Sequence, residues 1–236
     1  MIETAMILAA GKGTRMQAAA TDPPKPLTAI AGETLLARML NRMMAAGITK
    51  IIVNVHHKAE QIEAMLADFA AAHPMLEIIV SDERDSLLET GGGVKKALPL
   101  LGASPFLVAN ADLMWLENRP AIDALMAGFD ASHMQARLLM AARDTATGYD
   151  GAGDYHMDAD GQLTRRGTED ADLIFAGVQI LTPALFAAMP DGAFSLNKVY
   201  DQAQKADALF GTLLDGRWMH VGTPQGRAAA EALMTS

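Results

Sequence analysis

Short apolar segments alternate with helix-like segments over the first half of this chain, and this alternation constrains the fold most strongly. Residues 5–9 and 50–55 are short, largely apolar runs, the pattern of strands buried on both faces. Between them, residues 33–46 repeat apolar side chains at helical spacing. Such alternation predicts a parallel sheet with right-handed crossovers over about the first 115 residues. The further elements predicted here are strands at 76–80 and 106–109, a helix at 59–72 and a short helix from about residue 92.

The second half of the chain contains more strands in succession. An Asp-Ala-Asp-Gly turn at residues 158–161 separates two of them. We find no linker, low-complexity tract or internal repeat, so we expect an α/β chain with one domain over residues 1–236. The strands predicted in this half are 138–142, 155–157, 162–164 and 174–181, and the helices are near 183–188, 195–206 and 224–234.

Composition excludes several classes of function. The formal net charge is −9, which argues against a protein that coats nucleic acid, because phosphate backbones require clustered Lys and Arg. Cysteine is absent, so disulfides, thiolate nucleophiles and Cys-based zinc sites are excluded. No export signal precedes the first apolar run, and no apolar stretch is long enough to cross a bilayer. We therefore expect a cytoplasmic protein with no membrane partner.

The loop after the first predicted strand carries the strongest chemical signal. It reads Leu8-Ala-Ala-Gly-Lys-Gly-Thr-Arg-Met16. Gly11 and Gly13 let the backbone bend and approach a ligand, and their N–H groups can line a nest for phosphate oxygens. Lys12 and Arg15 bring cations to the same loop. This combination predicts a triphosphate site.

A second segment, Pro24-Lys-Pro-Leu27, adds a lysine on a stiff stretch of chain, because prolines flank Lys25 on both sides. Two commoner phosphate motifs are missing. The spacing of a P-loop does not occur, and the third glycine of a dinucleotide fingerprint is replaced, since Thr14, Arg15 and Met16 follow Gly13.

Together these segments resemble those of the sugar-nucleotide pyrophosphorylases, a family of sugar-1-phosphate nucleotidyltransferases. The resemblance continues in the same order through residues 88–94, 110–112 and 221–223. It implies a Rossmann-like nucleotidyltransferase fold with a mainly parallel central sheet and extra mixed strands in the C-terminal half. About residues 1–115 would then bind the nucleotide, and about residues 116–236 the sugar phosphate.

Within this family, the short chain and its Leu-Glu-Thr-Gly-Gly-Gly segment most resemble the N-acetylmuramate-1-phosphate uridylyltransferases of cell-wall recycling. The implied reaction joins UTP and a sugar 1-phosphate with the help of Mg²⁺ and releases pyrophosphate. Mannose- and heptose-1-phosphate guanylyltransferases are the nearest alternative. A non-catalytic nucleotide sensor and a dinucleotide-binding dehydrogenase are alternatives of other classes. The set of charged residues at the site disfavours the sensor, and the missing third glycine disfavours the dehydrogenase.

The resemblance also implies roles for individual residues. Asp112 directly follows an apolar strand and would hold Mg²⁺, a hard ion that prefers oxygen ligands. Arg15 would hold the leaving pyrophosphate, and Lys25 would stabilise charge near the reacting phosphates. The nucleotide-binding residues implied are Ala10, Gly11, Lys12, Gly13, Thr14, Arg15, Lys25, Glu89, Gly91 and Gly92, and the substrate-binding residues are Asn110, Asp154 and Gly177.

Three positions leave alternatives open. Glu89 is either a contact to the base or ribose or a solvated acid. Arg165 and Arg166 are either partners for an acidic sugar substituent or part of an exposed hairpin. His220 stands where the family usually carries a metal-binding aspartate, so it is either the second metal ligand or a neighbour of the site. The chain also carries residues 17–20 as Gln-Ala-Ala-Ala, where the family often has Pro-Leu-Thr.

Overall fold

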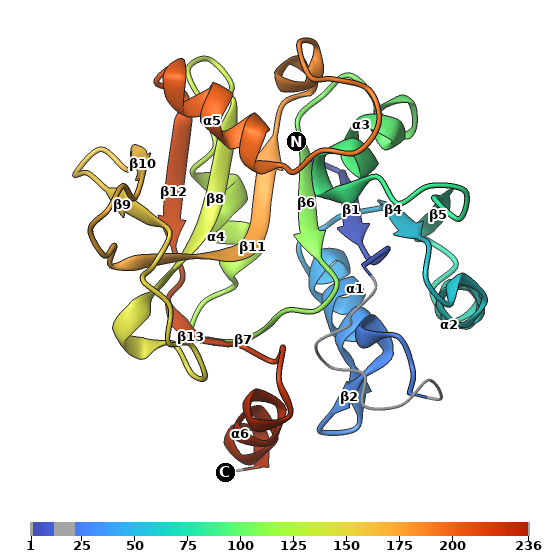
Figure 1. Cartoon of the computed structure of the whole chain (residues 1–236). Helices are drawn as coiled ribbons and strands as arrows, with labels where there is room; N and C mark the ends of the chain where they lie inside the picture. Colours follow the sequence, from blue (N-terminus) through green and yellow to red (C-terminus); the bar gives the residue numbers. More distant parts are fainter. Residues whose placement is uncertain (1, 12–21, 236) are drawn as a thin grey trace.

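The structure, a computed structural model, describes residues 2–11 and 22–235 and has an α/β architecture (Figure 1). Its strands are β1 (Thr4–Leu8), β2 (Ala29–Ile30), β3 (Glu33–Thr34), β4 (Lys50–Val55), β5 (Glu77–Asp82), β6 (Phe106–Asn110), β7 (Met114–Glu117), β8 (Ala136–Ala142), β9 (Tyr155–Met157), β10 (Leu163–Arg165), β11 (Leu173–Leu181), β12 (Leu209–Leu213) and β13 (Gly216–Met219). Its helices are α1 (Leu35–Ala45), α2 (Ala59–Ala72), α3 (Glu89–Leu101), α4 (Ala121–Ala127), α5 (Asn197–Lys205) and α6 (Pro224–Thr235), with 3₁₀ turns η1 (Lys25–Leu27), η2 (Arg143–Thr145) and η3 (Pro183–Phe186).

The central sheet runs through both halves of the chain. Its strands lie in the order β10-β9-β11-β6-β1-β4-β5, and β8 and β12 extend it from β11. Strands β6, β1, β4 and β5 are parallel, whereas β11 is antiparallel to β6. The chain passes from β1 toward β4 and β5 and then returns to the other side of β1 as β6. Ligands of open α/β sheets bind at such a reversal, outside the carboxyl ends of the strands. The ends of β1 and β6 therefore mark a binding crevice.

Helices cover both faces of this sheet. Successive side chains of β1 point to opposite sides, so apolar residues on each face need a covering layer. Ala5 and Ile7 belong to a core cluster that includes buried residues of α1, α2 and α4. Met6 belongs to a second cluster that includes buried residues of α3 and α5 (Figure 1). This is the doubly wound arrangement predicted from the sequence, and the α/β fold class is confirmed.

The elements predicted in the first half match the structure closely. Strand β4 and helix α2 have the predicted bounds, and α1 lies within the predicted range. Thr34 caps α1, because its hydroxyl accepts a hydrogen bond from the Ala37 N–H at 3.1 Å. Gly47 follows the end of α1 with a φ of +83°, the left-handed conformation expected of a glycine there.

Two predicted helices are corrected by the structure. The helix expected from about residue 92 begins at Glu89 and continues to Leu101, although its first turn contains glycines with poor helix propensity. The helix expected at residues 183–188 is a single 3₁₀ turn, Pro183–Phe186. Pro190 follows closely and disfavours helical backbone at the residue before it.

Strands β7 and β13 form a small antiparallel sheet, and β12 pairs in parallel with β8. Neither β7 nor β12 was predicted, and α4 was also missed. Helix α6 packs on the β2–β3 side of the molecule through a small cluster that includes Ile30, Met219 and Ala230. Within residues 2–11 and 22–235, no helix is both long and apolar enough to span a membrane.

Candidate active site

A pocket of about 290 Å³ lies outside the carboxyl ends of β1 and β6. We call it the main pocket because most of the described residues of the predicted site line it. It is thus at the reversal of strand order where a ligand of an open α/β sheet is expected. Predicted site residues from four separate segments of the chain line it. These residues are Ala10, Gly11, Lys25, Glu89, Asn110 and Asp112.

Lys25 and Asp112 contact each other directly in the wall of this pocket. Pro24 and Pro26 flank Lys25, and the Leu27 N–H donates to the Pro24 carbonyl at 2.8 Å to close the η1 turn. The Lys25 ammonium forms an ion pair with the Asp112 carboxylate, and the two side chains are 18% and 34% exposed. The predicted cation and the predicted metal-binding carboxylate are therefore adjacent.

A buried polar network supports the walls of the main pocket. The Ala9 N–H donates to Asn54 Oδ1 at 2.7 Å, and Asn54 Nδ2 donates to Glu83 Oε1, also at 2.7 Å. The Leu88 N–H donates to the other oxygen of Glu83 at 3.2 Å. Asn54 and Glu83 are almost fully buried, so the network links the end of β1 to the loop before α3 in a place that excludes water.

Sequence reasoning missed both Asn54 and Glu83. Asn54 offered one signal, because it is a polar residue inside an apolar strand. Its partner lies on a different strand end, and nothing in the local sequence indicates their pairing.

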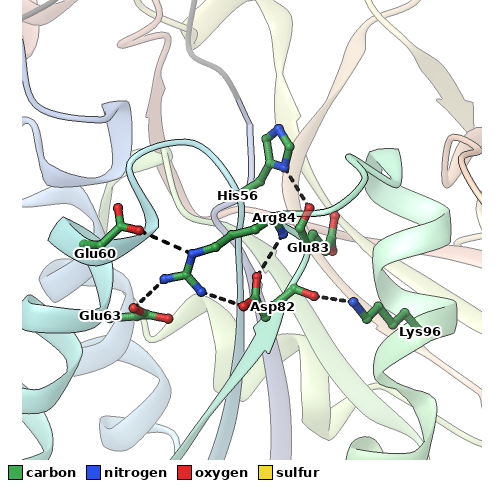
Figure 2. A network of polar contacts seen from close by, with 7 residues as sticks. All are labelled: His56, Glu60, Glu63, Asp82, Glu83, Arg84 and Lys96. Atoms are coloured by element: carbon green, nitrogen blue, oxygen red, sulfur yellow. Dashed lines mark hydrogen bonds and ion pairs between the residues drawn. The ribbon is translucent and has the colours of Figure 1, made fainter.

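Arg84 ties the loop between β5 and α3 to acidic residues on its outer side, as Figure 2 shows. Its guanidinium lies 2.7 Å from Glu63, 2.5 Å from Asp82 and 3.4 Å from Glu60. The hydrogen bonds that Arg84 donates to Glu63 and Asp82 raise the pKa of its guanidinium above the ordinary value. In the same view, the His56 ring lies 2.7 Å from the Glu83 carbonyl and Lys96 bonds the Asp82 carbonyl. The loop that follows β5 is thus fixed on both sides.

The first turn of α3 shows why it carries three glycines. A Cβ on Gly91 would lie 2.4 Å from the Phe194 ring, and one on Gly92 would lie 2.1 Å from the Gly192 carbonyl oxygen. The N–H groups of both glycines donate to the Phe194 carbonyl. Close contact within the chain therefore requires these glycines, and their contact with a nucleotide stays a prediction. Glu89 lines the main pocket with a φ of +58°, a backbone conformation rare for residues other than glycine.

A second pocket of about 330 Å³ holds another predicted residue, Asp154. The carboxylate of Asp154 accepts a hydrogen bond from the Phe175 N–H at 2.9 Å. Burial raises the pKa of Tyr155 in its wall to about 12, so the phenol stays neutral at physiological pH. Arg165 and Arg166 line the same pocket, on the predicted β9–β10 hairpin and just after it.

Gly177, another predicted substrate-binding residue, lies on β11. Val178 pairs with Ala109 of β6, so continuing the register by one step sets Gly177 opposite Asn110. Its φ is +86°, and a Cβ there would lie 2.6 Å from the Leu113 side chain. A bulge in the pairing of β11 with β8 spans this position. The glycine therefore lets β11 bend close to the loop that bears Asp112.

His220 directly follows β13. Its Nδ1 lies 3.2 Å from the Gly148 carbonyl oxygen, and its ring stacks on Trp218 with centroids 6.0 Å apart. A carbonyl only accepts hydrogen bonds, so in the neutral ring Nδ1 carries the proton and Nε2 is free to bind a cation. Met219 pairs with Met114, and one further step sets His220 opposite Leu113, the neighbour of Asp112. His220 is not part of the main pocket's wall.

The residues at the main pocket fit a magnesium ion that arrives with phosphate. Asp112 offers a carboxylate there, and Asn110 an amide oxygen. Among the described residues, no three His, Asp or Glu side chains gather into a complete metal site. Mg²⁺ commonly takes one or two carboxylates and completes its shell with substrate phosphates and water. The sparse set of ligands at this pocket is therefore compatible with this ion. The predicted Lys12, Gly13, Thr14 and Arg15 lie outside the described residues.

Comparison with known proteins places this architecture among nucleotidyltransferases. Residues 5–160 match the family model described as the MobA-like NTP transferase domain. The chain is 42% identical over 230 residues to the N-acetylmuramate alpha-1-phosphate uridylyltransferase of Caulobacter vibrioides. The matched region covers 97% of this chain and 95% of that protein. It is 34% identical to the enzyme of the same name from Neisseria meningitidis serogroup B, with 97% of each chain covered.

A solved structure shares the fold at lower identity. The putative glucose-1-phosphate thymidylyltransferase of Bacillus anthracis, in complex with a sucrose, superposes with a TM-score of 0.81. That comparison covers 98% of this chain and 94% of the other, at 14% identity. The predicted nucleotidyltransferase fold is confirmed.

Proposed function

This chain belongs to the MobA-like NTP transferases, and we propose that it transfers the uridylyl group of UTP to N-acetylmuramate 1-phosphate, giving UDP-N-acetylmuramate and pyrophosphate. Its membership among sugar-1-phosphate nucleotidyltransferases follows from its identity with two uridylyltransferases over nearly its whole length. The choice of UTP and of this sugar rests on the names of those relatives. The observation that carries the proposal is the main pocket, where the described residues of the predicted site converge, namely Ala10, Gly11, Lys25, Glu89, Asn110 and Asp112.

The reaction is an in-line displacement that needs no protein nucleophile. A phosphate oxygen of the sugar 1-phosphate forms a bond to the α-phosphorus of UTP, and the bond from that phosphorus to the pyrophosphate oxygen breaks. Alignment and charge neutralisation are what the protein must supply. Lys25 is held rigidly at the main pocket, so its ammonium can stabilise negative charge without first moving into place.

Other residues of the main pocket would orient the two substrates. Asn110 is the last residue of β6, two positions before Asp112, and its amide can bond ribose or sugar phosphate there. Leu87 comes from the loop that Glu83 and Arg84 fix, and Glu89 and Thr90 begin α3 directly after it, so the three form a preorganised wall for the nucleoside. Arg15 keeps its predicted role at the pyrophosphate.

Asp112 would hold Mg²⁺, with His220 as the candidate second ligand. When bound, the ion supplies positive charge to the phosphate oxygens. The ammonium of Lys25 lies beside the Asp112 carboxylate, so both charges stand where the phosphates would bind.

We further propose that the enzyme acts in the cytoplasm, in the recycling of peptidoglycan sugars. A substrate panel tests the assignment. With Mg²⁺, pyrophosphate should appear only when a nucleoside triphosphate and a sugar 1-phosphate are both present, with UTP as the best nucleotide. A clear preference for GTP would move the chain to the guanylyltransferases. Triphosphate hydrolysis without sugar would contradict transferase activity.

A further inference from the structure

The second pocket contains a cation that the proposed function has not used. We propose that this pocket binds the acidic substituent of the sugar and that Arg166 holds its carboxylate, which makes Arg166 a residue that determines sugar specificity. The inference rests on the proposed function, because it assumes an acidic sugar 1-phosphate as the acceptor.

The linings of the two pockets are connected through neighbouring residues on two sides. Thr90, in the wall of the main pocket, accepts a hydrogen bond from the Leu196 N–H at 2.9 Å, and the next residue, Asn197, lines the second pocket. On the other side, Phe175 of the second pocket lies two residues before Gly177, which faces Asn110 of the main pocket. A sugar whose phosphate lies beside Asn110 would therefore extend its ring toward the second pocket.

The side chain of Arg165 is bonded to other residues in and beside the wall of the second pocket. One of its terminal nitrogens donates to the Tyr155 hydroxyl and to Asn197 Oδ1, each at 3.2 Å. Its Nε lies 3.1 Å from Asp201, and its guanidinium sits 5.5 Å from the centre of the Tyr155 ring. These contacts balance its charge and fix its position, so Arg165 shapes the pocket.

Arg166 differs from Arg165 in the contacts of its side chain. Its backbone is fixed, because its N–H donates to the Asp154 carbonyl at 2.9 Å. Its guanidinium makes no hydrogen bond or ion pair with any residue in the ranges 2–11 and 22–235. The nearby Asp154 carboxylate is engaged by the Phe175 N–H. Arg166 is thus an exposed cation on an anchored backbone in the wall of the second pocket, and no described residue pairs with its guanidinium.

The chemistry of the sugar matches this arrangement. N-acetylmuramate differs from N-acetylglucosamine only by a lactyl ether on the ring, which ends in a carboxylate. A guanidinium binds a carboxylate through two parallel hydrogen bonds, a geometry that lysine cannot reproduce. Loss of one charge-assisted contact of this kind weakens binding roughly ten- to a hundred-fold.

The test compares two acceptors that differ only in the lactyl group. We would measure kcat/KM with UTP and either N-acetylmuramate 1-phosphate or N-acetylglucosamine 1-phosphate, for the wild-type enzyme and for Arg166→Gln. The variant should lose roughly ten- to a hundred-fold in kcat/KM with the acidic sugar, chiefly through KM, and should keep its rate with the neutral sugar. Arg166→Lys should recover part of the loss. Arg119→Gln is the matched control, because Arg119 is 83% exposed and pairs with Asp215 before β13.

The outcomes separate this inference from the proposed function. An equal loss with both sugars, or no loss with either, would overturn the role of Arg166 and leave the uridylyltransferase assignment intact. A wild-type enzyme that prefers the neutral sugar would overturn both the choice of sugar and the inference. Thermal unfolding of Arg166→Gln close to that of the wild type would show that the change is not one of folding.

Discussion

The ammonium of Lys25 and the carboxylate of Asp112 form an ion pair between residues 87 positions apart in the sequence. The pair joins the η1 turn to the loop after β6 at the mouth of the main pocket. Both groups are held in place by the fold before any substrate arrives, which is the condition under which a fixed charge lowers a barrier most effectively.

Replacement of Lys25 should affect turnover far more than folding. Lys25→Ala should lower kcat/KM roughly 100- to 1,000-fold, the scale on which one electrostatic stabiliser acts. Asp112→Ala should reduce metal-dependent turnover at least as much. Thermal unfolding should change little, because a partly exposed ion pair contributes about 0–1 kcal/mol. Steady-state kinetics of both variants would measure this, and a rate close to wild type in either would remove that residue from the mechanism.

His220 should control which metal serves the enzyme best. An imidazole nitrogen is a softer ligand than a carboxylate, and Mg²⁺ strongly prefers oxygen. If His220 binds the ion, His220→Asp should raise activity with Mg²⁺ relative to activity with Mn²⁺. Metal titrations of both proteins at one pH give the ratio. An identical Mn²⁺/Mg²⁺ ratio in the two proteins would mean that His220 does not contact the metal.

The buried network at Glu83 should contribute to both stability and nucleotide binding. Glu83→Ala leaves the Asn54 amide and the Leu88 N–H without their acceptor, and an unsatisfied buried donor costs about 1–3 kcal/mol. Urea unfolding should therefore show a clear loss, with a raised KM for UTP. Glu60→Ala is the control, since that side chain is 79% exposed in its pair with Arg84 and should change stability by less than about 1 kcal/mol. Equal effects of the two changes would contradict the network's role.

Gly177 and Gly192 form a matched pair for testing the bend in β11. Both have a positive φ, of +86° and +82°, so Ala at either position incurs the same backbone strain of about 1–2 kcal/mol. A Cβ at Gly177 meets Leu113, whereas a Cβ at Gly192 has nothing within 4 Å. Gly177→Ala should be the more destabilising and should also lower kcat, because Leu113 adjoins Asp112. Equal unfolding midpoints would show that the approach to Leu113 is unimportant.

The core of the fold was predictable because its signals are local. Strands such as β1 and β4 are buried on both faces, so each is a largely apolar run, and α1 and α2 repeat apolar residues at helical spacing. The loop motif after β1 and the Pro-flanked lysine then located the main pocket. The pairing of Lys25 with Asp112 needed the fold, although each residue was named from the sequence.

The remaining features depend on contacts between distant segments. Strands β7 and β12 are short and acquire their partners from β13 and β8, which nothing in their own sequences indicates. The glycines at the start of α3 disfavour a helix by propensity. They are needed because Phe194 and Gly192, about 100 residues later, pack too close to leave room for a Cβ. Glu83 resembles an ordinary surface residue in the sequence, and Asn54 stands out only as a polar residue in an apolar strand, so their burial together is visible only in the fold.

The central claim is that the main pocket catalyses uridylyl transfer to a sugar 1-phosphate. Its most direct measurement is pyrophosphate release by the purified chain with Mg²⁺, UTP and N-acetylmuramate 1-phosphate, compared with each substrate alone. We predict rapid release only when both substrates are present, together with formation of UDP-N-acetylmuramate in equal amount. Pyrophosphate release that does not depend on the sugar, or the absence of a UDP-sugar product across a panel of sugar 1-phosphates, would contradict the assignment.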